Sequence, residues 1–413
     1  MKRVSGSTPW KTDKWFTSPW NWAAQVRQDF RFADEIELYD VSLRDGEQQA
    51  GLIFDRDLKL ALAEKLAEVG VHRIEAGMPV VSPQDAEVIK ILAARNDFPA
   101  RIFSFARCLK EDVKRSVDLG VKNICMEVPI SDHLIENAYR WSVERAVEHS
   151  IEATLYAHDN GLYVSFFTID STRADIDDYL DLIEKVATHG HMDELTVVDT
   201  FGGLHVQAVP YLIRKVKERI KDKPIGVHFH DDYGLGAATT LAALAAGVNI
   251  AHTTISGIGE RAGNAAYEDV ALGLLTLYGI DLGLRYDRIY PLSKFLREKS
   301  GLTVRQNQGI VGDDLADIES GIVADWYRNA MEKAPLELSP YRYSLTGHPD
   351  TRVVIGKMSG IATVDIYLEQ LGLNSSLEQR QEIVIRVKEK AYEKMGLLTL
   401  GEFENIARSV IGE

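Results

Sequence analysis

The chain has 413 residues, 45 % of them hydrophobic, and it carries a formal net charge of −15. This acidic balance opposes a nucleic-acid-binding protein, which usually shows a basic face, and no run of about 18 apolar residues predicts a membrane span. The two cysteines, Cys108 and Cys125, form no CxxC motif, so we expect a cytoplasmic protein with reduced thiols.

Residues 1–33 form a tryptophan-rich N-terminal arm with little helical periodicity. The aromatic and proline residues of this arm are Trp10, Trp15, Trp20, Trp22, Pro9 and Pro19. A solvated tail would not normally expose so many large rings. We expect the arm to pack on its own barrel or on a second copy of the chain, and the alternative is an aromatic lid over a ligand. It has no apolar core typical of a signal peptide.

From residue 36 onwards, strand-like and helix-like segments alternate. The expected strands are residues 36–43, 72–77, 101–106, 121–128, 163–169, 194–199, 224–230 and 249–256. The expected helices are residues 56–70, 83–95, 110–120, 141–158, 175–190, 205–220, 235–247 and 264–279. A (β/α)8 TIM barrel needs eight such units in about 250 residues. We therefore predict an α/β fold with a catalytic (β/α)8 barrel over residues 34–282.

Residues 283–413 lose this alternation. Helical patterns at 319–331, 376–396 and 400–410 are separated by loops. We predict that the barrel is followed by small, mostly helical C-terminal subdomains.

Polar residues stand where each expected strand ends, which is where a barrel carries its chemistry. In chain order they are Arg44 and Asp45, Glu75, Arg107, Ser131 and Asp132, Asp170, Asp199 and Thr200, His228 and His230, and Asn264. Eight polar strand ends are more uniform than loops selected for solubility alone. We expect an active site at this end of the barrel.

The sharpest of these features is the stretch from His228 to His230. Alternate residues of a strand point to one face, so both imidazoles would project into the barrel mouth, where they suit a divalent metal. Asp45 would add a carboxylate oxygen, since the first and seventh strands flank the eighth in a closed barrel, and Asn264 would add an amide oxygen. The alternative is that both histidines only make hydrogen bonds in a polar layer.

The glycine-rich segment 256–264 ends at Asn264 and precedes a helix. It is either an ordinary strand-to-helix turn with Asn264 as the N-cap, or a loop, stabilised by Glu260 and Arg261, whose backbone amides lie near an anion. Glycines before a helix are weak evidence of function by themselves.

Five motifs, taken together and in order, resemble the metal-dependent acyltransferases that include 2-isopropylmalate, homocitrate and citramalate synthases. The motifs are DVSLRDGEQ (40–48), IEAGMP (74–79), VVDTFG (197–202), HFHDDYGL (228–235) and SGIGERAGNAAYEDV (256–270). These enzymes belong to the DRE-TIM metallolyase superfamily, which also contains hydroxymethylglutaryl-CoA lyase. The resemblance is strong over residues 36–280 and weaker beyond them.

The resemblance implies a divalent zinc, manganese or magnesium ion, and the metal ligands it implies are Asp45, His228, His230 and Asn264. It implies condensation of an acyl-CoA, usually acetyl-CoA, with a 2-oxo acid, in which Arg44 stabilises an enolate-like oxygen. The catalytic residues that we expect are Arg44, Asp170 and Thr200. The substrate contacts that we expect are Gln48, Glu75, Arg107, Ser131 and Thr200. It also implies a homodimer that forms through the C-terminal subdomains and the N-terminal arm.

Two departures from this family concern proton transfer. The synthases carry a glutamate after the fifth strand, whereas the nearest carboxylate here is Asp170. They also carry a HESGIH-like pattern, and Asp317 and Val323 occupy its two histidine positions in this chain. A synthase with a different base, such as Asp170 or Tyr233, is the reading that we favour. The alternatives are a metal-dependent carbon–carbon lyase and a barrel that binds metal without catalysis.

Overall fold

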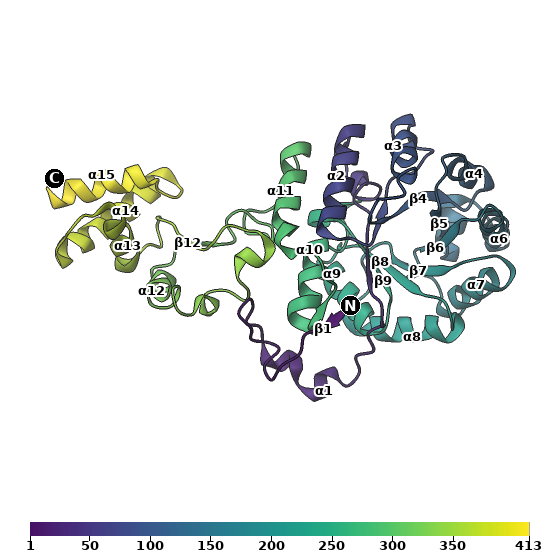
Figure 1. Ribbon diagram of the computed structural model, residues 1–413, viewed down its shortest axis with the longest axis horizontal. Helices are drawn as coiled ribbons and strands as arrows, with labels where there is room; N and C mark the ends of the chain where they lie inside the picture. The colour runs from purple at the N-terminus through teal and green to yellow at the C-terminus, as the bar shows by residue number, and fades with distance from the viewer. Residues whose placement is uncertain (413) are drawn as a thin grey trace. The chain divides into compact units, whose positions relative to one another are not determined.

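The computed structural model describes residues 1–412, which form two compact units (Figure 1). The first unit comprises residues 1–6 and 20–304, and the second comprises residues 7–19 and the chain from residue 305 onwards. The domain boundaries expected from the sequence stay a prediction, and the N-terminal arm is divided between the two units. None of the helices formed by residues 1–412 has the length and apolar character that a membrane span requires.

Eight parallel strands close into a barrel in the first unit, with β9 paired to β2. The strands are β2 (Glu37–Asp40), β3 (Arg73–Glu75), β4 (Arg101–Arg107), β5 (Asn123–Pro129), β6 (Tyr163–Ile169), β7 (Glu194–Asp199), β8 (Ile225–Phe229) and β9 (Ile250–Thr253). This confirms the predicted (β/α)8 fold. All the expected strands are present, although β2 ends at Asp40 and the chain then turns through residues 41–45 to place Arg44 and Asp45.

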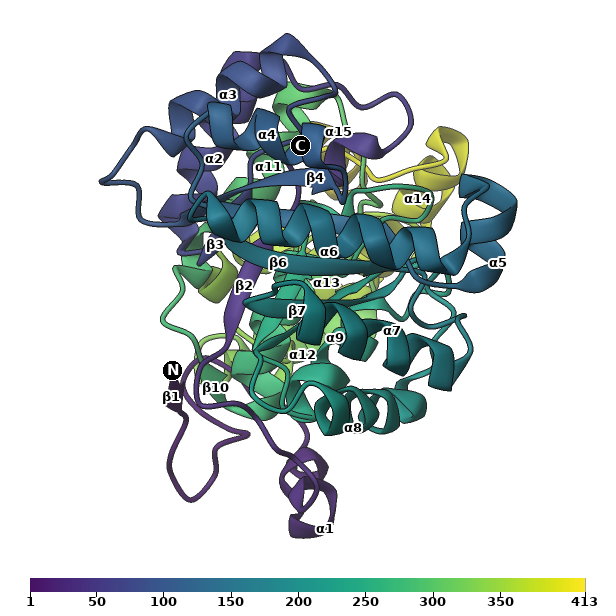
Figure 2. The same cartoon turned by 90° about the vertical axis from the view of Figure 1, so that its right-hand side faces the viewer.

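Helices surround the barrel, and Figure 2 shows the long helix α6 running beside β6. They are α2 (Arg56–Val69), α3 (Pro83–Ala93), α4 (Lys110–Asp118), α5 (Asp132–Leu134), α6 (Val143–Asp159), α7 (Ile176–His189), α8 (Val209–Arg219), α9 (Gly236–Ala245), α10 (Tyr267–Gly273) and α11 (Ile289–Ser300). Their ends follow from local chemistry. The Asp55 side chain accepts the Leu58 N–H at the start of α2, and Gly70 ends that helix at φ 91°.

The lower part of the barrel interior is filled by side chains, as in other barrels of this size. Arg73 donates to both carboxylate oxygens of Glu194 at 2.8 and 2.6 Å, and also pairs with Glu37. Above this ion cluster, the ring of Tyr39 packs against Phe103 at 4.8 Å between centroids. The barrel is therefore closed below, and only the carboxyl ends of its strands leave room for chemistry.

The second unit is mainly helical. It contains α12 (Gly321–Ala330), α13 (Ile361–Leu371), α14 (Leu377–Lys394) and α15 (Leu400–Ile411), with a short parallel pair of strands, β11 (Asp317–Ile318) and β12 (Arg352–Val353). Val364, Ile383, Val387 and Phe403 are buried in its core. The predicted helical C-terminal region is confirmed.

The N-terminal arm contacts both units. The strand β1 (Lys2–Arg3) pairs with β10 (Ile280–Asp281) in the first unit, as Figure 2 shows. A short 3-10 turn at Pro19–Trp22 precedes the helix α1 (Ala24–Arg27). The indole of Trp22, at the end of this turn, lies so close to Gly279 that a side chain at position 279 would clash with it. Trp15, in contrast, bridges to Tyr341 within the second unit. Trp15 and Trp22 thus help to anchor this arm, whereas Trp20 is 81 % exposed.

Candidate active site

Three buried side chains meet at the mouth of the barrel: Asp45, His228 and His230. The Oδ2 atom of Asp45 lies 3.1 Å from Nε2 of His228 and 3.8 Å from Nε2 of His230. The two imidazole Nε2 atoms are 3.3 Å apart. One carboxylate oxygen and two ring nitrogens therefore converge on a single point, in the arrangement that a divalent cation requires.

The protonation states of these groups suit a metal site. Burial lowers the pKa of His228, and burial together with His228 lowers the pKa of His230 to about 4, so both imidazoles are neutral at neutral pH. Burial would raise the pKa of Asp45, but the charge of Arg44 and the hydrogen bond from His228 outweigh it and hold this pKa well below its usual range. Neutral imidazoles and an ionised carboxylate are the forms that bind metals.

Asn264 completes this group from the loop after β9. Its Nδ2 atom donates to Oδ2 of Asp45 at 2.7 Å and to the carbonyl of Ile258 at 3.2 Å. Its Oδ1 atom is buried and, within residues 1–412, has no hydrogen-bond partner. Rotation of the amide would turn this unsatisfied oxygen to the side where Asp45 lies. Asn264 could then supply a fourth ligand atom, so the four side chains fit a divalent metal. Asn264 is not an N-cap, because the N-cap of α10 is Ala266.

The loop that carries Asn264 is tied to the neighbouring strand ends. Arg261, at φ 56°, donates two hydrogen bonds of 2.9 Å to Asp232 and a third to the backbone carbonyl of Thr200. Arg261 therefore holds the loop, the role that one of the two alternatives from the sequence gave to Glu260 and Arg261, whereas Glu260 is exposed.

Arg44 lies beside the three-residue cluster and is also buried. Its Nε atom donates to Oε1 of Glu75 at 2.5 Å, and its Nη1 atom lies 3.6 Å from the carboxylate of Asp45 and 3.5 Å from Oε1 of Gln48. Its guanidinium stacks 3.9 Å from the ring centroid of Phe105. Its Nη2 atom is buried without a partner in the described chain. One N–H group of Arg44 is thus available to a ligand.

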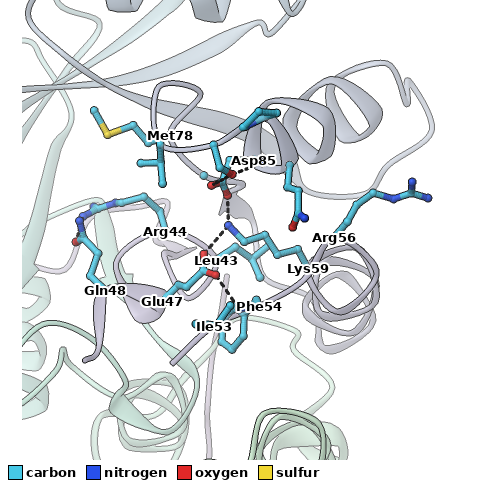
Figure 3. Close-up of a pocket in the computed structure, with 15 residues that line it drawn as sticks. Leu43, Arg44, Glu47, Gln48, Ile53, Phe54, Arg56, Lys59, Met78 and Asp85 are labelled. Carbon is cyan, nitrogen blue, oxygen red and sulfur yellow. Dashed lines mark hydrogen bonds and ion pairs between the residues drawn. The ribbon is translucent and has the colours of Figure 1, made fainter. Parts of the chain in front are cut away.

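A cavity of about 670 Å3 adjoins Arg44 and Gln48, between the loop after β2 and the start of α3. Figure 3 shows Lys59 of α2 between Glu47 and Asp85 at its centre. The Lys59 ammonium lies 2.6 Å from Oε2 of Glu47 and also contacts Asp85. This buried ion triad fixes the loop that carries Arg44 to two helices. Sequence reasoning missed it because its members are far apart in the chain, with Asp85 26 positions after Lys59, and follow no motif.

Asp170 follows β6 with a left-handed backbone, at φ 63°. Its carboxylate accepts hydrogen bonds from Arg173 at 2.7 and 2.9 Å and from the Ser131 hydroxyl at 2.7 Å. Its backbone N–H donates to Oγ1 of Thr200 at 2.8 Å. The structure thus brings Ser131, Asp170 and Thr200 together, but Arg173 and Ser131 occupy the carboxylate of Asp170.

The side chain that β6 directs into the barrel mouth is that of Ile169. It packs against an apolar cluster that contains Phe105, Phe167 and Val198. Strand alternation explains this placement, because Phe167 and Ile169 lie on one face and Asp170 follows on the other side. The side chains that β6 presents on this face, including Phe167 with its ring 5.1 Å from that of His228, are therefore apolar.

Arg107, which we expected to contact substrate, turns towards α4. Its guanidinium forms two hydrogen bonds with Asp112, at 2.6 and 3.1 Å, and its side chain is 46 % exposed. In the second unit, Asp317 pairs with Arg352 at 2.5 and 2.9 Å, and Val323 lies on α12. Neither of these positions carries a free imidazole.

Comparisons with known proteins agree with this geometry. Residues 35–296 match the HMGL-like family. The chain is 34 % identical to homocitrate synthase AksA of Methanothermobacter thermautotrophicus, over 97 % of this chain and 99 % of that protein. It is 37 % identical to a probable 2-isopropylmalate synthase of Methanopyrus kandleri, over 92 % and 74 % of the two chains. It is 36 % identical to a putative (R)-citramalate synthase CimA of Archaeoglobus fulgidus, over 86 % and 71 %.

Among solved structures, the chain resembles the HMG-CoA lyase of Bacillus subtilis with a TM-score of 0.60. The match covers 67 % of this chain and 98 % of that one, at 20 % sequence identity. Identity at this level supports the barrel fold and carries no argument about the reaction.

Proposed function

Because this chain belongs to the HMGL-like family, we propose that it is a metal-dependent enzyme that condenses an acyl-CoA with a 2-oxo acid. With acetyl-CoA the methyl carbon attacks the ketone carbon of the 2-oxo acid, and water then cleaves the thioester. The products are a 2-hydroxy-2-carboxymethyl acid and free CoA. The observation that carries this proposal is the buried Asp45–His228–His230 cluster, with Arg44 3.6 Å from Asp45.

Asp45, His228, His230 and Asn264 would hold the divalent metal, and the chemistry of these donors suits zinc, manganese or magnesium. When bound, such a metal supplies Lewis acidity to the oxygen atoms of a 2-oxo acid. The similarity to named synthases over most of the chain supports the same assignment.

Arg44 would stabilise negative charge on the reacting oxygen through its unpaired Nη2 atom. Glu75 would orient Arg44, because it holds the Nε atom of Arg44 and also accepts a 2.8 Å hydrogen bond from Tyr39. Gln48 would contact the acyl donor from the rim of the adjoining cavity.

Thr200 and Ser131 would contact the 2-oxo acid at the other side of the mouth, whereas Arg107 would have to leave Asp112 to do so. For Asp170 the geometry favours a supporting role over proton transfer, since its carboxylate already accepts hydrogen bonds from Arg173 and Ser131. A homodimer and a cytoplasmic location remain part of the proposal. Both cysteines are buried free thiols, in keeping with a reducing compartment.

The proposal is tested by thiol release from acetyl-CoA with a panel of 2-oxo acids, in the presence of each candidate metal. We expect release with at least one 2-oxo acid and none after treatment with a chelator. Thiol release that no 2-oxo acid stimulates would contradict the proposal. Cleavage of 2-hydroxy-2-alkyl diacids or their CoA thioesters would instead favour a lyase. A lyase is the second candidate because Ile169 faces the barrel mouth and Val323 stands at a histidine position of the synthases.

A further inference from the structure

Glu127 is a carboxylate at the barrel mouth that none of the roles above uses. It lies on β5 two residues after Cys125, which is buried in the apolar cluster of Phe105 and Phe167. Because alternate residues of a strand share a face, Glu127 projects into the barrel above Cys125. The sequence analysis considered only the polar residues at the end of this strand, Ser131 and Asp132, and so missed Glu127. The alternation of residues 123–129 could have shown that Glu127 lies on the same face as Cys125.

The neighbours of Glu127 place it near Arg44 and on the strand next to Phe167. Across β5 and β6 it is in register with Phe167, whose ring centroid lies 5.1 Å from that of His228. The guanidinium of Arg44 lies 5.6 Å from the same Phe167 ring. Glu127 is therefore the strand neighbour of Phe167, and the Phe167 ring lies close both to His228 of the candidate metal site and to Arg44.

The other carboxylates that face this mouth are already engaged. Asp45 lies in the metal-ligand cluster, Glu75 holds Arg44, and Asp170 holds Arg173. Asp199 accepts hydrogen bonds from the Thr172 hydroxyl and from the backbone of the loop after β7. Within residues 1–412, only electrostatic interactions and burial act on the Glu127 carboxylate, and no hydrogen bond holds it.

We propose that Glu127 is the general base of the condensation, an inference that rests on the proposed function. Its carboxylate takes one proton from the methyl carbon of the acyl-CoA. The C–H electron pair forms the new bond to the ketone carbon of the 2-oxo acid, and the ketone oxygen takes up the negative charge. The proton on Glu127 then passes to that oxygen to give the hydroxyl group, which regenerates the carboxylate.

The surroundings of Glu127 favour a base that works near neutral pH. Burial raises the pKa of Glu127 to about 7, while the positive charges of Arg44 and Arg107 lower it, and Glu75 and Asp112 raise it. Tyr139 and Cys108 also face this carboxylate, and burial together with its charge raises the pKa of each, so both are protonated at neutral pH. A general base is most effective when its pKa lies near the working pH.

The test compares Glu127→Gln and Glu127→Asp with wild type in the thiol-release assay, each loaded with metal. Glu136→Gln is the matched control, because Glu136 is exposed on the turn after α5. We expect Glu127→Gln to lower kcat by about 100-fold or more, with little change in the KM for either substrate or in metal content. Glu127→Asp should retain part of the activity and show a larger primary isotope effect with deuterated acetyl-CoA.

The pH profile adds a readout that a structural role would not move. Wild-type kcat/KM should fall as pH drops below about 7, and Glu127→Gln should lose this acidic limb. If Glu127→Gln keeps the wild-type kcat, or keeps the acidic limb of the kcat/KM profile, Glu127 is not the base. That result would leave the proposed function standing. A wild-type protein that releases no thiol with any 2-oxo acid would overturn the proposed function together with the assignment of Glu127. If Glu127→Gln does not fold, the isotope effect of Glu127→Asp decides, and an unchanged value rejects Glu127 as the base.

Discussion

Oε1 of Glu75 accepts a hydrogen bond of 2.5 Å from Nε of Arg44, and the two side chains are 0 % and 7 % exposed. Glu75 thus neutralises a buried cation and also fixes its direction, since the second oxygen of Glu75 is held by Tyr39. Removal of one partner of a buried ion pair leaves an uncompensated charge.

Glu75→Gln keeps the shape of the side chain and removes its charge. We expect the free energy of unfolding to fall by up to about 3–5 kcal/mol, because buried Arg44 loses its hydrogen-bonded counter-charge and keeps only the more distant carboxylate of Asp45, 3.6 Å away. Chemical denaturation measures this change. Glu87→Gln, which removes an exposed partner of Arg56, should change the same quantity by less than about 1 kcal/mol. Equal effects of the two substitutions would contradict the buried ion pair.

His228→Ala should abolish the metal site. Loss of an outer partner of a ligand already weakens metal binding by about 10–100-fold, so loss of a ligand should weaken it by at least about 100-fold. Calorimetric titration with zinc, manganese and magnesium measures the affinity. His205→Ala, on an exposed histidine whose ring forms a hydrogen bond with Gln207, should bind metal as wild type does. Undiminished binding in His228→Ala would place the metal elsewhere.

The sequence predicts the barrel well because its signals are local. Apolar strand-like segments alternate with helical ones, and side-chain caps such as Asp55 and Ser82 mark the starts of some helices. The metal-ligand cluster also follows from the sequence, since barrel closure brings the loop after β2 beside β8 and β9. His228 and His230 are two residues apart, so their side chains share one face whenever they lie at the end of a strand.

The proton-transfer half of the site could not be predicted in the same way. Asp170 is the nearest carboxylate in sequence, but its left-handed backbone turns it towards Arg173 and leaves Ile169 at the mouth. The direction of a side chain after a strand end depends on one pair of backbone angles, which the sequence does not specify. The buried Glu75–Arg44 pair likewise depends on contacts between strands.

Asp170→Asn tests whether Asp170, and not Glu127, acts as the general base. Asparagine tolerates the left-handed conformation but cannot balance the charge of Arg173, so we expect the free energy of unfolding to fall by about 1–3 kcal/mol. The acidic limb of the kcat/KM profile should persist, because the base lies elsewhere. Loss of that limb in Asp170→Asn would identify Asp170 as the base.

Lys59→Met tests the buried triad beside the cavity. Glu47 and Asp85 would both lose their shared cation, so the free energy of unfolding should fall by about 3–5 kcal/mol. Lys114→Met, which breaks an exposed pair with Asp118, should cost less than about 1 kcal/mol. A small effect of Lys59→Met would show that solvent screens the triad.

Glu268 gives the stability of the protein a pH dependence. It is buried on α10, its Oε2 atom accepts the Ser256 N–H at 3.0 Å, and its Oε1 atom has no partner in the described chain. Burial, with a further contribution from Asp269, raises the pKa of Glu268 to about 8 in the folded state. The unfolded chain ionises near the ordinary pKa of glutamate, about 4.3, so between these values the folded state binds more protons and stability falls as pH rises.

Glu268→Gln removes this titration. Below about pH 4 both states of wild type are protonated, so any difference between the proteins there reflects the amide alone. As pH rises towards 8, wild type should lose stability that the variant keeps, and the Tm of the variant relative to wild type should increase steadily. Thermal denaturation between pH 5 and 8 measures this trend. Glu260→Gln, on an exposed glutamate of the loop before α10, should follow wild type, and a parallel response of Glu268→Gln would show that Glu268 is ionised in the folded protein.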